Sequence, residues 1–394
     1  MKPGEGRVIA MLGTSQTLAW ASSYYLAAIL ANPIAAELGL GTAWVFVAFS
    51  SGLLAAGFLG PVSGKLIDRH GGHRVLPGSN LLFATALASI GLASGPVSLI
   101  AAWTLLGVAM SCGLYESAFS TLARIYGTDA RRAITGITLI AGFASTIGWP
   151  LTAWYEASFG WRTACYLWAA THLVICLPLN VLLPAGKHAA PAASGAPAPI
   201  PDRRQRWVMA GLAFVFAATW FGSTAMAAHL PRVLQEAGAT LPAAVAAAAL
   251  IGPAQVAARA MEFWFLRRVS PLVSAQVASL AHPVGVGVLL AAGAPAAPVF
   301  TVMHGAGNGV MTIANGTLPL HLFGAGGYGL RQGLLMLPAR LLQSAAPFLF
   351  DILLSRFGMA ALGFTGALGI ASFVVLSLIR TRSSGRLPQR PTGR

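Results

Sequence analysis

The sequence predicts an all-α membrane protein in which twelve transmembrane helices form two parallel six-helix repeats. Three observations support this fold class: the composition, the spacing of the apolar runs and an internal repeat. Of the 394 residues, 56% are hydrophobic and only 9% are charged, whereas soluble domains carry about 25% charged residues. A surface with so few charges suits lipid, and this composition argues against a soluble enzyme.

Twelve apolar runs are long enough to cross a bilayer, since a helix needs about 20 apolar residues to cross ~30 Å of hydrocarbon. The expected spans of the first half are residues 8–36, 43–64, 75–94, 97–124, 132–156 and 161–183. Those of the second half are residues 207–231, 243–266, 271–292, 297–322, 329–354 and 358–380.

The basic residues indicate the orientation of these spans. If the N-terminus is cytoplasmic, 20 Lys and Arg residues fall in cytoplasmic segments, and three fall outside, namely Arg162, Arg232 and Arg356. Cytoplasmic loops of membrane proteins are enriched in Lys and Arg. We therefore expect a multi-pass protein of the inner (plasma) membrane with both termini in the cytoplasm.

The chain divides into two related halves. We expect an N-terminal six-helix half at 1–183, an Ala- and Pro-rich cytoplasmic linker at 184–206, and a C-terminal half with a short basic tail at 207–394. Matches recur at a spacing of about 195 residues; they include Trp20 with Trp220, Gly60-Pro61 with Gly252-Pro253, and Pro150 with Pro347. Two parallel halves of this kind enclose a cavity at mid-membrane and can rock to expose it alternately.

The loop after the second span, GPVSGKLIDRHGGHRVL, has a distinctive pattern. It resembles the signature loop of the major facilitator superfamily at Gly64, Leu66, Asp68, Arg69, Gly71 and Arg74. Asp68 can lie at the positive N-terminal end of the helix that begins near Tyr328, where a negative charge is favoured.

The fifth span resembles the Gly- and Pro-rich fifth helix of the same superfamily through Gly136, Gly142, Gly148 and Pro150. Small residues allow close helix contact. The resemblance covers the whole chain, although the loop after the eighth span keeps only basic charge. It implies a secondary transporter whose gating involves Gly64, Asp68, Arg69, Gly71, Arg74, Gly148 and Pro150.

Three ionisable residues lie deep in the expected spans: Glu116, Arg259 and Arg340. Charges inside a membrane are costly and face a cavity or a partner. The first hypothesis is that both Arg residues bind a small carboxylate, which a guanidinium matches bidentately. The alternative is structural pairing, of Arg259 with Glu262 or Glu116 and of Arg340 with Glu116.

A narrower resemblance favours the first hypothesis. The stretch from Gly252 to Arg259 is similar to that of the monocarboxylate-porter group, but Gln255 stands where that group has an acidic residue. A basic residue in the eighth span together with one in the eleventh is also similar to the oxalate:formate antiporter branch. The resemblance implies that Arg259 and Arg340 hold a small carboxylate or a comparable oxyanion.

Other polar residues predict the rest of the site. Gln16, Trp20 and Tyr24 share one face of the first span. Further candidates to line the cavity are Trp220 and Asn308, although hydrogen bonding between helices is an equal explanation for such polar stripes. Glu116 is either the partner of an Arg or a proton-coupling carboxyl group, and His304 either titrates or has a packing role.

Several classes of function are excluded. No Walker A loop or HExxH motif occurs, and the three cysteines lack metal-ligand spacing. We therefore expect no enzyme activity, no cofactor and no metal, and despite the net charge of +15 no nucleic-acid partner. The expected function is secondary active transport of a small organic anion by a monomer in the bilayer, driven either by a coupling proton or by exchange of solutes. The alternative is efflux of a toxic or amphipathic compound or a metalloid.

Overall fold

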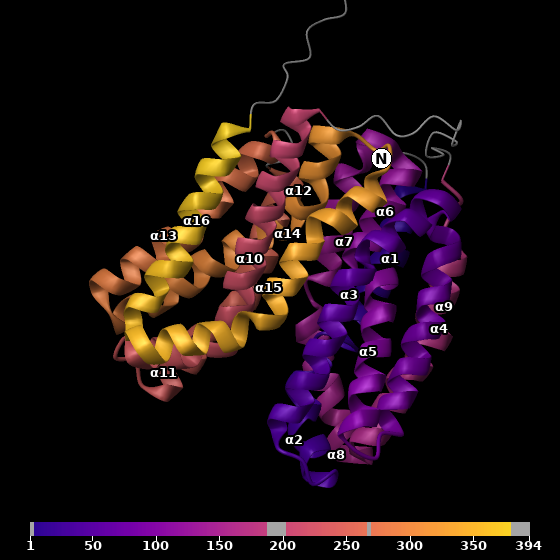
Figure 1. The fold of residues 1–394 in the computed structure, drawn as a ribbon, viewed down its shortest axis with the longest axis horizontal. Coiled ribbons are helices and arrows are strands. Elements are labelled where there is room, and N and C mark those ends of the chain that lie inside the picture. The colour runs from indigo at the N-terminus through magenta and orange to yellow at the C-terminus, as the bar shows by residue number, and fades with distance from the viewer. Residues whose placement is uncertain (1–3, 187–201, 266–268, 380–394) are drawn as a thin grey trace, which may run out of the picture.

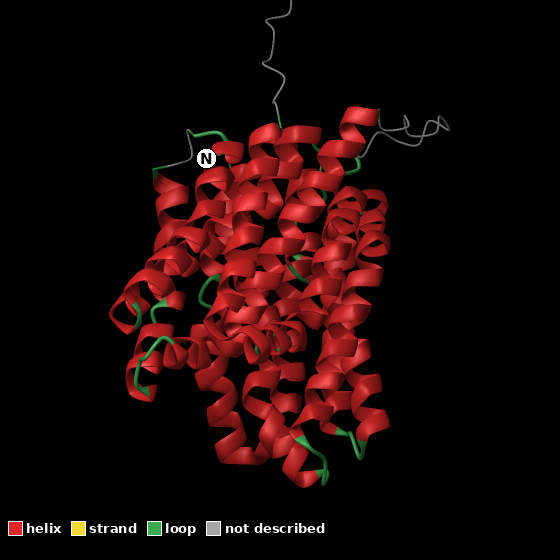
Figure 2. Cartoon of the chain, turned by 60° about the vertical axis from the view of Figure 1, so that its left-hand side comes forward, coloured by secondary structure: helices red, strands yellow, loops and turns green. Residues whose placement is uncertain are grey.

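A computed structural model describes residues 4–186, 202–265 and 269–379. Residues 187–201, which make up most of the expected linker, lie outside the described residues, as does most of the basic tail. The described residues are helical and contain no strand (Figure 2), which confirms the all-α prediction.

The N-terminal half consists of helices that follow the expected spans. They are α1 (Glu5–Ala21), α2 (Leu26–Glu37), α3 (Thr42–His70), α4 (Gly72–Gly91), α5 (Pro96–Gly113), α6 (Tyr115–Tyr126), α7 (Arg131–Ala141), α8 (Ala144–Thr171) and α9 (Leu177–Val181), with a π-helical turn at His172–Cys176 before α9. Some expected spans are broken. The first consists of α1 and α2, and the fourth consists of α5 and α6, which are separated by the extended backbone of Leu114 (φ −88°, ψ −166°).

The C-terminal half also follows the expected spans. Its helices are α10 (Arg203–Glu236), α11 (Leu241–Ala248), α12 (Ile251–Trp264), α13 (Pro271–Ala292), α14 (Ala297–Phe323), α15 (Tyr328–Phe357) and α16 (Ala361–Leu378). The second expected span of this half has a break between α11 and α12. Figure 1 shows the two halves as separate bundles, α1–α9 in indigo to magenta and α10–α16 in red to yellow. Most buried apolar residues cluster within one bundle, although Leu320 and Tyr328 of the C-terminal half join the N-terminal cluster.

Six stretches of the described residues are long and apolar enough to cross a membrane: 42–70, 96–181, 203–236, 241–264, 271–292 and 328–378. The second contains 86 residues, which as one straight helix would be about 130 Å long. It instead changes direction at Gly160, whose φ of 79° suits glycine, so it holds more than one crossing. The total of twelve crossings remains a prediction.

The two halves meet along one pair of helices more than any other, α3 and α15. Glycines make this approach possible: a Cβ on Gly64 would lie 2.0 Å from the carbonyl oxygen of Gly329, and a Cβ on Gly333 would lie 2.5 Å from the backbone of Gly60. Other contacts between the halves join α7 to α12 and α14, and α6 to α14 and α15. The bundles are close at the end where the N-terminus lies and diverge toward α2 and α11 (Figure 1).

This packing gives a first testable prediction. Gly64→Ala places a methyl group against the α15 backbone, and overpacking of this kind costs about 1–3 kcal/mol, so the joint between α3 and α15 should open. Spin labels at Lys65 and Leu334 should then report a longer or broader distance distribution. Gly60→Ala is the matched control, because its Cβ would meet α15 only at an ordinary 3.7 Å. Equal distance distributions in the two variants would contradict the prediction.

Candidate substrate site between the two halves

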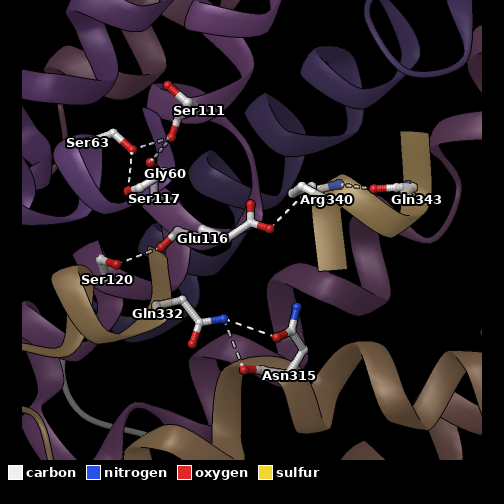
Figure 3. A network of polar contacts seen from close by, with 10 residues as sticks. All are labelled: Gly60, Ser63, Ser111, Glu116, Ser117, Ser120, Asn315, Gln332, Arg340 and Gln343. Carbon is white, nitrogen blue, oxygen red and sulfur yellow. Dashed lines mark hydrogen bonds and ion pairs between the residues drawn. The ribbon is translucent and has the colours of Figure 1, made fainter. Parts of the chain in front are cut away.

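An ion pair joins the halves at the centre of the protein. Glu116 Oε1 on α6 lies 2.6 Å from Arg340 Nη2 on α15, and Gln343 Oε1 accepts a 2.8 Å hydrogen bond from Arg340 Nη1. Figure 3 shows the Glu116 carboxylate directed across the interface toward Arg340. One of the two deep guanidinium groups is therefore neutralised by a carboxylate, as the structural-pairing hypothesis proposes for Arg340.

The break between α5 and α6 positions Glu116. Because α6 starts after Leu114, Glu116 lies in its first turn, where the helix dipole favours a negative charge. The carbonyl oxygen of Ser111, near the end of α5, accepts hydrogen bonds from the Ser63 and Ser117 hydroxyls at 2.8 and 2.9 Å. Figure 3 shows these serines beside Glu116. The break is thus stabilised by hydroxyl donors from α3 and α6.

Aromatic rings surround this ion pair. The rings of Trp20 and Trp220, which occupy equivalent positions in the two halves, are parallel within 1° with centroids 6.4 Å apart. The guanidinium carbon of Arg340 lies 5.9 and 5.1 Å from these two centroids, within the range of a cation–π interaction. Tyr24 and Tyr115 pack on Trp20 at 5.5 and 5.0 Å. The Arg340 charge therefore lies beside an aromatic wall formed by Trp20, Trp220, Tyr24 and Tyr115.

Arg259 on α12 has a different environment. Its side chain is buried at 5% exposure, and it donates to the Thr138 carbonyl at 3.2 Å, to the Gly309 carbonyl at 3.4 Å and to the Thr312 hydroxyl at 3.4 Å. All three acceptors are neutral, and all three bonds are long. Among the described residues, no carboxylate forms an ion pair with Arg259.

The pairing of Arg259 with Glu262 or Glu116 is therefore not present in the structure. Glu262 instead pairs with Arg131 of the other half at 2.7 Å and accepts a 3.1 Å hydrogen bond from Ser274. Glu116 is bound to Arg340. Sequence reasoning missed the Arg131–Glu262 pair because the two residues lie in different halves and no local pattern links them.

Several buried polar atoms near the centre have no hydrogen-bond partner among the described residues. They include the Nε1 donor of Trp20, the Nε2 donor of Gln343 and the Oε1 acceptor of Gln16. Gln16 donates through Nε2 to the Gly113 carbonyl at 2.6 Å, which ties α1 to α5. Unpaired buried groups are costly, so the two free donors are sites where an acceptor-bearing ligand would be stabilised.

Asn308 does not join this group. It lines a separate cavity inside the C-terminal half, together with Ser223 and His304. His304 Nδ1 lies 2.9 Å from His282 Nδ1 there. Its partner on the neighbouring helix α13 could not be identified from the sequence, because helical periodicity gives the face of a residue but not the neighbour it meets.

The expected gating residues Gly64, Asp68, Arg69, Gly71 and Arg74 lie at the end of α3 and the start of α4. Asp68 accepts hydrogen bonds from the backbone N–H groups of Gly329 and Leu330, both at 2.9 Å, so its carboxylate lies at the N-terminus of α15. Arg69 and Arg74 are exposed.

The remaining expected gating residues have packing roles or lie at the surface. Gly71 ends α3 with a φ of 84°, a backbone conformation that suits glycine. Gly148 packs closely against Ala21 of α1, and Pro150 is exposed.

The central ion pair gives a second prediction. Glu116→Gln should leave Arg340 without its carboxylate and cost about 3–5 kcal/mol, the usual effect of breaking a buried pair, and so lower the thermal unfolding midpoint of the purified protein. Adding Arg340→Gln should recover much of that loss. Glu236→Gln is the matched control, since its pair with Arg232 is exposed and should contribute about 0–1 kcal/mol. A Glu116→Gln variant as stable as the control would refute this assignment.

Comparison with known proteins places the chain in a family. The family model described as Major Facilitator Superfamily matches residues 12–286. The crystal structure of the human organic anion transporter MFSD10 (TETRAN) is similar, with a TM-score of 0.72, 16% sequence identity, and coverage of 95% of this chain and 100% of that chain. The proton:xylose symporter XylE bound to 6-bromo-6-deoxy-D-glucose is also similar, with a TM-score of 0.73, 11% identity, and coverage of 95% and 94%. No curated protein matches the sequence. Since the family match spans well over half of the chain, this protein belongs to the Major Facilitator Superfamily and is a multi-pass membrane transporter rather than an enzyme.

Proposed function

We propose that this protein is a secondary active transporter that moves a small organic monoanion across the inner membrane by alternating access, with both termini in the cytoplasm. The observation that carries this proposal is the environment of Arg259. A guanidinium at 5% exposure with only neutral acceptors is costly to bury. An anion that binds there removes that cost.

The balance of charge favours a monoanion. Of the three ionisable residues that the sequence places deep in the membrane, Arg340 is paired with Glu116 and Arg259 retains its charge. One carboxylate ligand would neutralise the remaining charge, whereas a dianion would leave an excess negative charge. The unpaired donors of Trp20 and Gln343 also suit an oxygen-rich ligand, and the aromatic wall suits an apolar organic body.

The position of Arg259 supports coupling between binding and movement of the halves. Its acceptor Thr138 belongs to α7 of the N-terminal half, whereas Gly309 and Thr312 belong to α14 of the C-terminal half. An anion that replaces the Thr138 carbonyl therefore weakens one bond between the halves. A ligand shifts an equilibrium only through different affinity for the two states, and this bond offers such a difference. The drive is a proton gradient or exchange of solutes.

The similar solved structures are consistent with this class of solute. MFSD10 is described as an organic anion transporter and XylE as a proton symporter. At 16% and 11% identity they indicate the fold alone, so the substrate proposal rests on Arg259 and its surroundings. The efflux of an amphipathic compound remains the competing hypothesis, and it would use the aromatic wall without Arg259.

A transport assay tests the proposal. Purified protein in proteoliposomes should take up labelled monocarboxylates from a panel such as formate, lactate, pyruvate and benzoate. Arg259→Gln removes charge-assisted hydrogen bonds worth about 1.5–3 kcal/mol, so uptake should fall roughly 10- to 150-fold. Arg259→Lys keeps the charge but not the bidentate fork, and should retain part of the activity.

Arg356→Gln is the control, because it removes one exposed Arg far along α15 from the site. Normal uptake by Arg259→Gln would show that the anion assignment is wrong. Failure of every anion, combined with sensitisation of cells to a toxic compound when the protein is deleted, would favour efflux.

A further inference from the structure

The C-terminal half contains its own polar cavity, separate from the Glu116–Arg340 pair. It has a volume of about 50 Å³ and lies among α10, α13, α14 and α16, room for water rather than for an organic solute. Among the described residues, no Asp, Glu, Lys or Arg lines it. Its polar lining includes Ser223, Ser279, Asn308 and Thr365 around two imidazoles, His282 and His304.

The two imidazoles form a hydrogen-bonded chain. His304 Nδ1 and His282 Nδ1 are 2.9 Å apart, and His282 Nε2 lies 2.9 Å from the Thr365 hydroxyl oxygen. That hydroxyl donates to the Leu362 carbonyl at 3.0 Å. With its hydrogen directed there, the Thr365 oxygen accepts from His282, so His282 carries its proton on Nε2. Its Nδ1 is then an acceptor, and His304 donates to it through Nδ1.

This order of donors leaves one basic nitrogen free. In the neutral chain, His304 Nε2 carries a lone pair, and no hydrogen bond to it occurs among the described residues. His304 borders the cavity, and the residue keeps 6% exposure. A base thus faces a water-sized space, held in one tautomer by His282 and Thr365.

Charged and titratable groups on the surrounding helices are few. On the four lining helices, α16 has none and α13 has only His282. On α14 the other group is His321, near its far end. On α10 the groups lie toward the two ends of the helix. Arg203, Arg204 and Arg206 lie at one end, and His229, Arg232 and Glu236 lie at the other.

On α12, which packs against α14, the groups are Arg259 and Glu262. Glu262 is paired, which leaves Arg259 as the charged group of α12 without a carboxylate partner among the described residues.

We propose that the His282–His304 pair is a proton-binding site inside the C-terminal half. A hydronium ion in the cavity gives its proton to His304 Nε2: one O–H bond breaks, one N–H bond forms, and water remains. The resulting imidazolium donates through Nδ1 to His282. His304 is the proton acceptor, and His282 is a positioning residue.

The site is connected to Arg259 through α14. Arg259 donates to the Thr312 hydroxyl, which itself donates to the Asn308 carbonyl at 2.8 Å, and Asn308 lines the cavity. Thr312 is eight residues from His304, about 12 Å along the helix. This coupling rests on the proposed function: an anion that neutralises Arg259 makes a second positive charge nearby easier to accept. Because such coupling is reciprocal, anion and proton should bind together and move in the same direction.

Nitrogen-15 NMR of the full-length protein labelled at histidine tests the proton site without any substrate. Between about pH 9 and pH 4, one coupled pair of imidazoles should pass from the neutral tautomers described above to a shared imidazolium. His304→Gln should remove this titration. His282→Gln should keep a His304 titration but lose the fixed tautomer. His321→Gln, on the same helix, is the control and should leave the pair unchanged. Two rings that keep fixed neutral tautomers over the whole range would overturn the proposal.

Transport measurements separate this proposal from the anion site. In proteoliposomes with formate, lactate or benzoate, an acidic exterior should accelerate uptake by the native protein. His304→Gln should abolish that acceleration but keep exchange of internal for external anion. Acceleration that survives in His304→Gln would overturn the proton site while leaving the anion site standing. If the imidazole pair titrates but the protein transports none of these anions, the anion site would be overturned and the proton site would stand.

Discussion

The cost of holding a guanidinium away from water determines the arrangement at the centre of this protein. The same constraint is met in two ways. Arg340 is neutralised by Glu116, hydrogen-bonded to Gln343 and covered by the Trp20 and Trp220 rings. Arg259 has only long bonds to neutral oxygens. The charge of Arg340 is balanced within the protein, whereas that of Arg259 has no carboxylate partner among the described residues, which is why we propose that it binds a ligand.

The repeat provides the frame for this asymmetry. Trp20 and Trp220 occupy equivalent positions and stack across the interface, so each half contributes one ring to the aromatic wall. The position in the N-terminal half that matches Arg340 is Phe143, and it carries no charge. The matched positions thus place similar residues in both halves, whereas the charged Arg340 has no counterpart in the N-terminal half. The His282–His304 cavity is likewise confined to the C-terminal half.

Sequence reasoning recovered what local pattern determines. The helices follow the expected spans, and Asp68 lies at the start of the helix that begins at Tyr328, as its loop suggests. The sequence left open which acidic residue pairs with which Arg. A pair of residues 224 positions apart, such as Glu116 and Arg340, depends on how the halves dock. The break at Leu114, which places Glu116 in the first turn of α6, has no clear sequence signal. The partner of His304 was equally hidden, because periodicity cannot choose among neighbouring helices.

The contacts between the halves are concentrated near the end that holds the N-terminus and at the centre. There, Asp68 caps α15, Arg131 pairs with Glu262, and glycine backbones of α3 and α15 touch. Opening that end requires these contacts, and the packing of Leu320 and Tyr328 on the N-terminal cluster, to break. The bundles can stay folded because most of the buried apolar residues of each bundle cluster within that bundle. Most of these contacts are short and well paired. The bonds of Arg259 are long and go to neutral acceptors, so we propose that they are the part of the joint that a bound anion would change most. In the proposed function, an anion at Arg259 acts on a bond between the halves, and a ligand shifts an equilibrium between two states only where its affinity for them differs.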